Sequence, residues 1–293
     1  MTWREHPGNP LIRPPFGSPI LADPTFLPPS ETPDGRWHLF AHSLFGIHRF
    51  VSHDGVAWER AGRTIARNAL RAFVYREGPT YWLFYEKCRL MLPILPIPWA
   101  SHIEVRTSPD LVHWSAPRTV LRPSLPWHSE PGRGRAVGNP CVVPVAGGFR
   151  LYYSAGLIFL PDCGFCEPRH IGIAESSLLE GPYQPEAAPV LGAGAIKVVR
   201  EGCTFLGFHN RIFSDELGRS RSAIWLLHSD DGRMWTEAEP EPILKPTDGW
   251  KRSHVYALDV RRVDDRWVVF FNARDDWHWS KGREAIGRAE ARP

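Results

Sequence analysis

The chain alternates short runs of aromatic and branched residues with turn-forming residues, and this alternation continues along nearly its whole length. Five apolar runs occupy comparable places, most of them after a tight turn: Trp37–Ala41, Tyr81–Tyr85, Phe149–Tyr153, Thr204–Phe208 and Trp267–Phe271. Aromatic and β-branched residues favour strands, and tight turns between such runs favour hairpins. The pattern therefore predicts an all-β protein.

A short phrase, Ser-x-Asp-x-x-x-Trp, recurs after further apolar runs. It stands at Ser52–Trp58, Ser108–Trp114 and Ser229–Trp235, and a looser version stands at Ser176–Tyr183. A repeat of this kind indicates a propeller or a solenoid. A short fourth apolar run follows each phrase: Arg63–Ile65, Thr119–Leu121, Pro189–Leu191 and Pro242–Leu244.

The last repeat lacks its fourth run, and the N-terminus supplies a matching one. Asn9–Pro14 resembles Glu241–Pro246 in the order of its apolar and proline residues. We therefore expect a five-bladed β-propeller in which the N-terminal strand completes the last blade and closes the ring. The whole chain, residues 1–293, is expected to form this one domain. An irregular all-β sandwich is the alternative.

Composition narrows the classes of function. The net charge is +3 with no cluster of basic residues, and no apolar stretch is long enough for a signal peptide or a membrane span, so neither nucleic acid nor a membrane is an expected partner. An odd number of cysteines without a signal peptide favours the cytoplasm. Cys163 and Cys166 form a single Cys-x-x-Cys pair, which Cys88 or His170 could extend, but two ligands do not make a zinc site. No metal or cofactor is expected.

Two polar residues before proline mark the place where chemistry is expected. Asp23 precedes Pro24 at the start of the first inner strand, and Asn139 precedes Pro140 at the equivalent place in the third repeat. An Asp before Pro can simply cap a turn. Because inner strands of a propeller begin near its axis, the shared register instead favours a common site there, with Asp23 as its carboxylate.

The second strands carry a further signal. Aligning them places one polar residue at the same position in every repeat: His42, Glu86, Ser154, His209 and Asn272. A buried ring of polar groups is costly unless its members are paired or meet a polar ligand. Glu86 is the only carboxylate in the ring. By the same register, Glu201 lies in a hairpin turn at the opposite face.

Two long loops open toward the expected site. The apolar segment 90–99 of the first could line a cleft, join two subunits of a homo-oligomer, or pack over its blade. The second loop carries Asp162, Glu167 and Arg169. The predicted catalytic residues are Asp23, Glu86 and Asp162. The predicted substrate-binding residues are His42, Arg71, Asn139, Ser154, Glu167, Arg169, His209, His254 and Asn272.

The Ala-Asp-Pro-Thr-Phe opening at Asp23, the five repeats and the Ser-x-Asp phrases together resemble the five-bladed glycoside hydrolases of families 43, 32 and 130. The resemblance implies that Asp23 is a general base, as in family 43, or a nucleophile, as in family 32. Two family 43 positions differ here. The second aspartate, in blade three, is replaced by Asn139, and the glutamate that opens blade four is replaced by the segment Ala195–Lys197.

The expected function is hydrolysis of a small glycoside or oligosaccharide of arabinofuranoside or xyloside type. Asp23 would act as base or nucleophile, and Glu86 is the preferred acid. Phosphorolysis or glycosyl transfer on the same scaffold is an alternative, with Arg169, Lys197 and Arg211 as an anion site. A propeller that binds carbohydrate without catalysis is the third possibility. In each case the expected partner is a carbohydrate.

Overall fold

The computed structural model describes residues 2–89 and 98–292, and within them the chain is built almost entirely of strands. Consecutive strands pair into five antiparallel groups, numbered here as blades one to five. Blade one contains β2 (Ala22–Leu27), β3 (Trp37–Ser43), β4 (Gly46–Ser52) and β5 (Glu59–Ala66). Blade two contains β6 (Ala69–Glu77), β7 (Thr80–Cys88), β8 (Trp99–Ser108) and β9 (Arg118–Leu121), with β10 (Ser129–Glu130) and β11 (Gly134–Arg135) beyond β8. The all-β prediction is confirmed.

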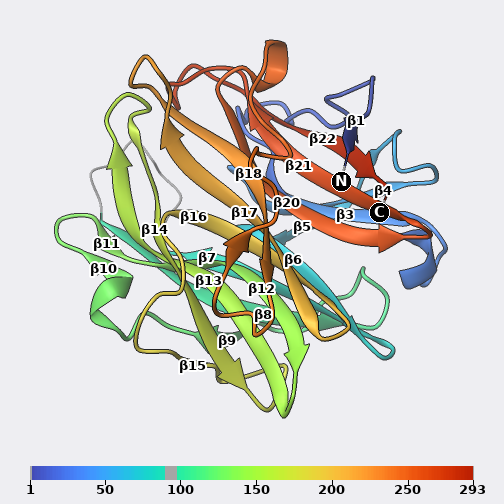
Figure 1. Cartoon of the computed structure of the whole chain (residues 1–293). Helices are drawn as coiled ribbons and strands as arrows, with labels where there is room; N and C mark the ends of the chain where they lie inside the picture. The colour runs from blue at the N-terminus through green and yellow to red at the C-terminus, as the bar shows by residue number, and fades with distance from the viewer. Residues whose placement is uncertain (1, 90–97, 293) are drawn as a thin grey trace.

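The remaining blades follow in chain order (Figure 1). Blade three contains β12 (Val137–Val145), β13 (Gly148–Leu160), β14 (Phe165–Ser176) and β15 (Gln184–Pro185). Blade four contains β16 (Gly194–Glu201), β17 (Thr204–Ser214), β18 (Ser220–Ser229) and β19 (Thr236–Glu237). Blade five contains β20 (His254–Val263), β21 (Arg266–Arg274), β22 (Glu284–Ala291) and the N-terminal β1 (Trp3–Glu5). The described residues also form three short 3-10 helices, at Pro29–Glu31, Pro126–His128 and Gly249–Lys251.

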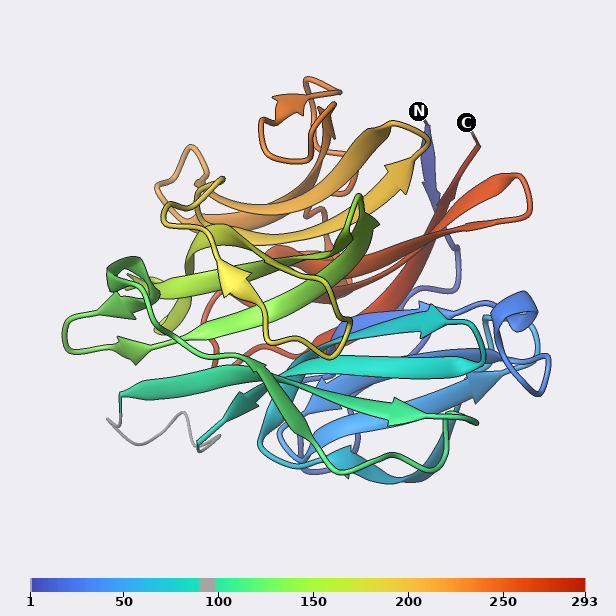
Figure 2. The same cartoon turned by 90° about the horizontal axis from the view of Figure 1, so that it is seen from below.

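The two ends of the chain meet in blade five. β1 pairs antiparallel with β22, and in Figures 1 and 2 the first strands, in blue, lie beside the last strands, in red. The strand predicted at Asn9–Pro14 is displaced, because only Ile12 in that segment forms a bridge, to Ile286. Prolines on both sides of Ile12 remove backbone donors that a longer ladder would need. The Asn9 side chain compensates by bonding both backbone groups of Arg288.

Two predicted fourth strands are also displaced. The runs at Pro189–Leu191 and Pro242–Leu244 contribute only single bridges, from Leu191 to Ile171 and from Leu244 to Ile224. The strands β15 and β19 lie earlier in the chain, and the prolines again explain why the bridges do not extend. Leu244 and Ile12 occupy matching places, so the predicted likeness between the N-terminus and Glu241–Pro246 holds in the structure.

The repeated Ser-x-Asp phrases are turns between the third and fourth strands of their own blades. In each copy the aspartate accepts hydrogen bonds from the serine hydroxyl and from two backbone N–H groups. The tryptophan that ends each phrase packs edge-on against a ring of the preceding blade: Trp58 against Phe270, Trp114 against Phe40 and Trp235 against Tyr152. The phrases therefore stabilise the contacts between blades and lie away from the inner strands.

Buried polar groups join the inner strands of blades one, two and five. The Thr25 hydroxyl donates to Asp259 Oδ2 at 2.8 Å and accepts from the Val74 N–H at 3.0 Å. Asp259 also accepts from the Phe26 N–H at 3.0 Å. The Arg261 guanidinium donates to the Val74 carbonyl at 2.6 Å and lies 3.4 Å from Asp259 Oδ2. Each blade in this group thus supplies a partner for a charge or a backbone group of another.

Blades three and four are joined in the same way. Lys197 is buried, donates from Nζ to the Pro140 carbonyl at 2.8 Å, and lies over the Phe73 ring of blade two. The Val198 N–H donates to Cys141 Sγ at 3.2 Å. Lys197 therefore has a structural place among the inner strands.

No helix in residues 2–89 and 98–292 combines the length and the apolar character needed to cross a bilayer. The cytoplasmic location and the single domain over residues 1–293 stay predictions. The predicted subunit contact through segment 90–99 falls mostly on residues 90–97, which lie outside the described residues.

We expect Thr25→Val to lower the free energy of unfolding by about 1–3 kcal/mol, because valine keeps the shape but leaves the Val74 N–H and one acceptor position of Asp259 unpaired. Urea unfolding measures the change. Thr25→Ser is the matched control, since it keeps the hydroxyl and should be less destabilising. Wild-type stability in Thr25→Val would contradict the role given to this hydroxyl.

Candidate active site

Irregular pairing near the start of the inner strands redirects one side chain in each of three blades. The register shifts between Ala22 and Thr25, between Leu70 and Phe73, and between Gly138 and Cys141. Inside these bulges Asp23, Arg71 and Asn139 have φ angles of 50°, 55° and 49°. Such left-handed conformations are uncommon for residues other than glycine and recur at functional sites. A fourth bulge, between Val255 and Leu258 in blade five, contains Tyr256.

The redirected side chains meet in one cavity of about 160 Å³. Its polar lining residues are Asp23, His42, Arg71, Asn139, Glu167, Asn210, Tyr256, Asn272 and Glu284. Six of these were predicted as site residues from the sequence: Asp23, His42, Arg71, Asn139, Glu167 and Asn272. A cavity of about 150 Å³ holds one benzene molecule, so this one has room for a single six-membered ring.

Asp23 is held from two sides. Its backbone N–H donates to Asn272 Oδ1 at 3.0 Å, and its Oδ2 lies 3.3 Å from His42 Nδ1. Burial, together with the field of Arg71, lowers the pKa of His42 to about 3, so this contact joins a neutral imidazole to the carboxyl and is not an ion pair. Burial raises the pKa of Asp23 to about 6, although Arg71 opposes the shift. At neutral pH Asp23 is therefore mostly ionised.

Glu86, the preferred acid of the sequence analysis, lies behind the cavity wall. It is fully buried, and its Oε2 accepts from Arg71 at 2.9 Å while its Oε1 accepts from the Trp99 indole at 3.0 Å. A Cβ placed on Gly138 would come within 1.8 Å of Glu86 Oε2, so the carboxylate packs directly on that backbone. Glu86 does not line the cavity. Its contacts make it the fixed counter-charge that orients Arg71.

Glu167 enters the cavity from β14, where it pairs with Ile158 of β13. Its side chain is half-buried and remains open to the cavity, in contrast to Glu86. Burial raises the pKa of Glu167 to about 8, with Arg71 opposing the shift and Glu284 and Asp23 adding to it. Glu167 is therefore mostly protonated at neutral pH. The sequence analysis placed it among the binding residues.

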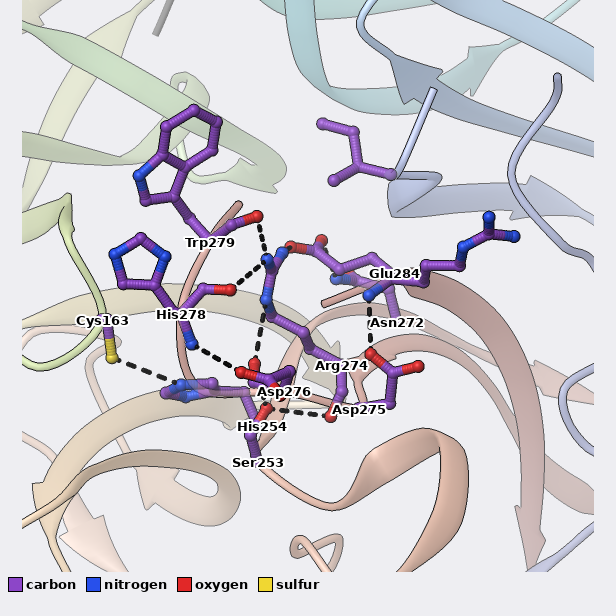
Figure 3. A network of polar contacts seen from close by, with 12 residues as sticks. Cys163, Ser253, His254, Asn272, Arg274, Asp275, Asp276, His278, Trp279 and Glu284 are labelled. Atoms are coloured by element: carbon purple, nitrogen blue, oxygen red, sulfur yellow. Dashed lines mark hydrogen bonds and ion pairs between the residues drawn. The ribbon is translucent and has the colours of Figure 1, made fainter. Parts of the chain in front are cut away.

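Glu284 is a cavity carboxyl that the sequence analysis missed. It accepts from Arg274 at 2.7 Å and from the Asn272 amide at 3.2 Å, so Asn272 connects it to the backbone of Asp23. Figure 3 shows Arg274 pairing with Glu284 while it also reaches backbone oxygens of the 276–279 turn. The sequence offered one clue. If the last two strands form a hairpin, Arg274 and Glu284 come opposite each other, and the β21–β22 pairing places them so.

Besides Glu86, five predicted site residues lie outside the lining of this cavity. Asp162, predicted to be catalytic, is bonded instead to the backbone and hydroxyl of Ser220. Arg169 pairs with Glu130 at 3.0 Å, on the surface. The Ser154 hydroxyl is buried and donates to the Gly194 carbonyl, and His209 is a buried ring that contacts the Ala193 carbonyl. His254 is buried behind Tyr256. The polar ring was thus correctly predicted as buried, but only His42 and Asn272 of its members reach the cavity.

The cysteine pair does not form a metal site with its neighbours. Cys163 is buried with its Sγ 3.6 Å from His254 Nε2, and burial raises the pKa of its thiol to about 12. Cys166 lies at the cavity wall. Within residues 2–89 and 98–292, no group of three or more His, Cys, Asp and Glu side chains is arranged to hold a metal ion. Glu201, as predicted, ends a strand at a hairpin turn.

Solved structures match the chain over most of its length, whereas no known family profile and no curated protein sequence matches it. A family 117 glycoside hydrolase from Zobellia galactanivorans is 14% identical, with a TM-score of 0.67 over 99% of this chain and 90% of that chain. An exo-1,5-α-L-arabinanase from a bovine ruminal metagenomic library is 14% identical, with a TM-score of 0.59 over 94% of this chain and 95% of that chain.

An N-acetylgalactosamine deacetylase from F. plautii, solved in complex with blood group B trisaccharide, is also 14% identical, with a TM-score of 0.69 over 99% of this chain and 95% of that chain. At these identities the likeness shows the fold alone. It confirms the predicted resemblance to propeller glycoside hydrolases at the level of the fold.

We expect Glu86→Gln to lower the pKa of Asp23 below about 6, because the positive field of Arg71 on Asp23 would no longer be offset by the Glu86 carboxylate. The pH titration of the Asp23 carboxyl carbon by NMR measures this, with Asp23→Asn used to assign the signal. Glu130→Gln, which removes the partner of Arg169 outside the cavity, should leave the titration unchanged. A pKa that stays the same or rises in Glu86→Gln would refute the arrangement.

Proposed function

We propose that this protein is a glycoside hydrolase in which Asp23 and Glu167 are the two catalytic carboxyls. The observation that carries the proposal is the separation of their pKa values, about 6 for Asp23 and about 8 for Glu167, within one cavity. Environments that push two carboxyl pKa values apart are how glycosidases keep one group ionised and the other protonated at the same pH. Asp23 acts as base or nucleophile, and Glu167 protonates the leaving oxygen.

Access to the substrate favours Glu167 over Glu86 as the acid. A general acid must come within hydrogen-bond distance of the leaving oxygen. Glu86 is fully buried and bonded to both Arg71 and Trp99, so a substrate could reach it only by displacing those contacts. Glu167 lines the cavity and has no salt bridge of 4 Å or less to a described residue. Its carboxyl is free to contact a bound glycoside.

The size of the cavity supports cleavage of terminal sugars. With room for about one ring, it would hold the residue at a chain end and leave the scissile oxygen at the mouth. The substrate class is therefore a small glycoside or an oligosaccharide with a free terminal residue, and arabinofuranosides and xylosides remain the first to test. Two of the three structural neighbours described above are glycoside hydrolases, and the third was solved with a trisaccharide bound.

The geometry gives phosphorolysis less support than hydrolysis. The three cations considered for a phosphate site lie apart: Arg169 pairs with Glu130, Lys197 is buried against the Pro140 carbonyl, and Arg211 pairs with Glu237. Of these, none lines the cavity that holds Asp23 and Glu167. The remaining alternative, carbohydrate binding without turnover, is separated from hydrolysis by the experiments below.

We expect Asp23→Asn and Glu167→Gln each to lower kcat/KM by about 10²–10⁴-fold on oligosaccharides, because each removes a proton-transfer or nucleophilic group. Release of single sugars from oligosaccharides measures the activity. Glu167→Gln should lose less on 4-nitrophenyl glycosides, whose leaving group needs little protonation. Asp162→Asn, outside the cavity, is the matched control and should retain wild-type kcat/KM. If the wild-type protein binds the tested glycosides but cleaves none of them, hydrolysis is refuted.

The pH dependence of kcat/KM is expected to be bell-shaped. Asp23 must be ionised, so activity should fall as the pH drops below about 6. Glu167 must be protonated, so activity should fall as the pH rises above about 8. The profile reports apparent values of the coupled pair in the free enzyme. In Glu167→Gln the basic limb should disappear while the acidic limb remains, and a basic limb that persists would assign the acid to another group.

A further inference from the structure

Tyr256 carries a buried hydroxyl without a partner at the wall of the cavity. Its side chain is 8% exposed, and its phenol oxygen has no hydrogen-bond partner in the part of the chain that the structure describes. The carboxyls of Glu167 and Glu284 influence the hydroxyl electrostatically, and both line the same cavity. Tyr256 itself lines that cavity, so its ring borders the same space as the two carboxyls. A buried polar group left unpaired is unfavourable, so its presence needs an explanation.

The ring of Tyr256 is held in place. It stacks on His254, with ring centroids 5.0 Å apart and ring planes at 11°. Its ring also packs edge-to-face with Phe165, with ring centroids 6.5 Å apart. Its backbone lies in the bulge between Val255 and Leu258. These contacts restrict rotation of the side chain, so the hydroxyl cannot easily swing to a partner elsewhere.

The neighbouring carboxyls do not supply the missing acceptor. Glu284 already accepts from Arg274 and Asn272, and neither it nor Glu167 is hydrogen-bonded to the phenol. Burial and the nearby carboxyls raise the pKa of Tyr256 well above its usual value, so the hydroxyl keeps its proton and remains a donor at any working pH. An occupant of the cavity can supply the missing acceptor, because Tyr256 lines that space.

We propose that the Tyr256 hydroxyl donates a hydrogen bond to one hydroxyl oxygen of the bound sugar and thereby selects for that hydroxyl. This inference rests on the proposed function, because it assumes a sugar in the cavity that holds Asp23 and Glu167. A site built to hydrogen-bond a substrate hydroxyl rejects analogues that lack it, because its own polar group is then left unpaired. Tyr256 is thus a specificity-determining residue.

The test compares Tyr256→Phe with the wild type on matched substrates. The probes are the 4-nitrophenyl glycoside that the wild-type protein cleaves fastest and its set of monodeoxy analogues. For the parent glycoside, Tyr256→Phe should lower kcat/KM about tenfold, the value of one neutral hydrogen bond. For one deoxy analogue, the wild type and Tyr256→Phe should differ by less than about twofold, because the hydrogen bond is already absent. Tyr183→Phe, whose hydroxyl bonds the Leu179 carbonyl outside the cavity, is the matched control.

The outcomes separate this inference from the proposed function. An equal loss on the parent and on every deoxy analogue would overturn it, since Tyr256 would then act through the fold or through Glu167. Wild-type activity in Tyr256→Phe would also overturn it while leaving hydrolysis intact. If the wild type turns over no glycoside, calorimetry with the free monosaccharides replaces kinetics. Binding that weakens in Tyr256→Phe only for sugars with one particular hydroxyl would then support the inference although hydrolysis had failed, and equal binding would overturn it.

Discussion

The arrangement of the inner strands depends on the contacts of one buried carboxylate, that of Asp259. It is 2% exposed and is bonded to the hydroxyl of Thr25 and the backbone of Phe26, with Arg261 beside it. A buried charge is tolerated only when it is paired and its remaining hydrogen-bonding positions are filled, so the strands that supply these partners must keep their relative positions. Lys197 has the same effect between blades three and four. The bulges that line the cavity lie directly beside these contacts, since Thr25 and Asp259 follow them in their strands.

The bulges in the inner strands turn polar side chains toward the cavity. A regular strand would alternate its side chains between neighbouring sheets, whereas a bulge redirects one residue at the cost of a ladder bond and an unfavourable backbone angle. Asp23, Arg71 and Asn139 each adopt that angle, in three different blades. Blade four has regular pairing at the equivalent place and contributes Gly194 and Ala195 to the lining. The strained bulge residues thus supply three of the polar groups that line the cavity.

The electrostatics of the cavity centre on one arginine. Arg71 faces Asp23 and Glu167 on one side and is paired with Glu86 on the other. Burial raises the pKa of both cavity carboxyls, and Arg71 opposes the shift in each case. The two values still differ: Lys197 further lowers the pKa of Asp23, whereas Glu284 and Asp23 raise the pKa of Glu167. The same few groups therefore set both the ionised and the protonated partner, and the neutral His42 adds no charge.

Most strands, their order, the turns of the Ser-x-Asp phrases and the position of Asp23 could be predicted from the sequence alone. Those features depend on neighbouring residues: aromatic and β-branched runs, the aspartates of the Ser-x-Asp phrases, and polar residues before Pro24 and Pro140. The prediction of the fourth strands was less accurate, because nearby prolines restrict the pairing of Ile12, Leu191 and Leu244 to single bridges. The folded chain was needed to show that Glu86 is covered, that Asp162 lies outside the cavity, and that Tyr256 and Glu284 line it. The burial and the pKa of a side chain depend on its distances to side chains from strands that are far apart in the chain. The order of residues along the chain does not contain those distances.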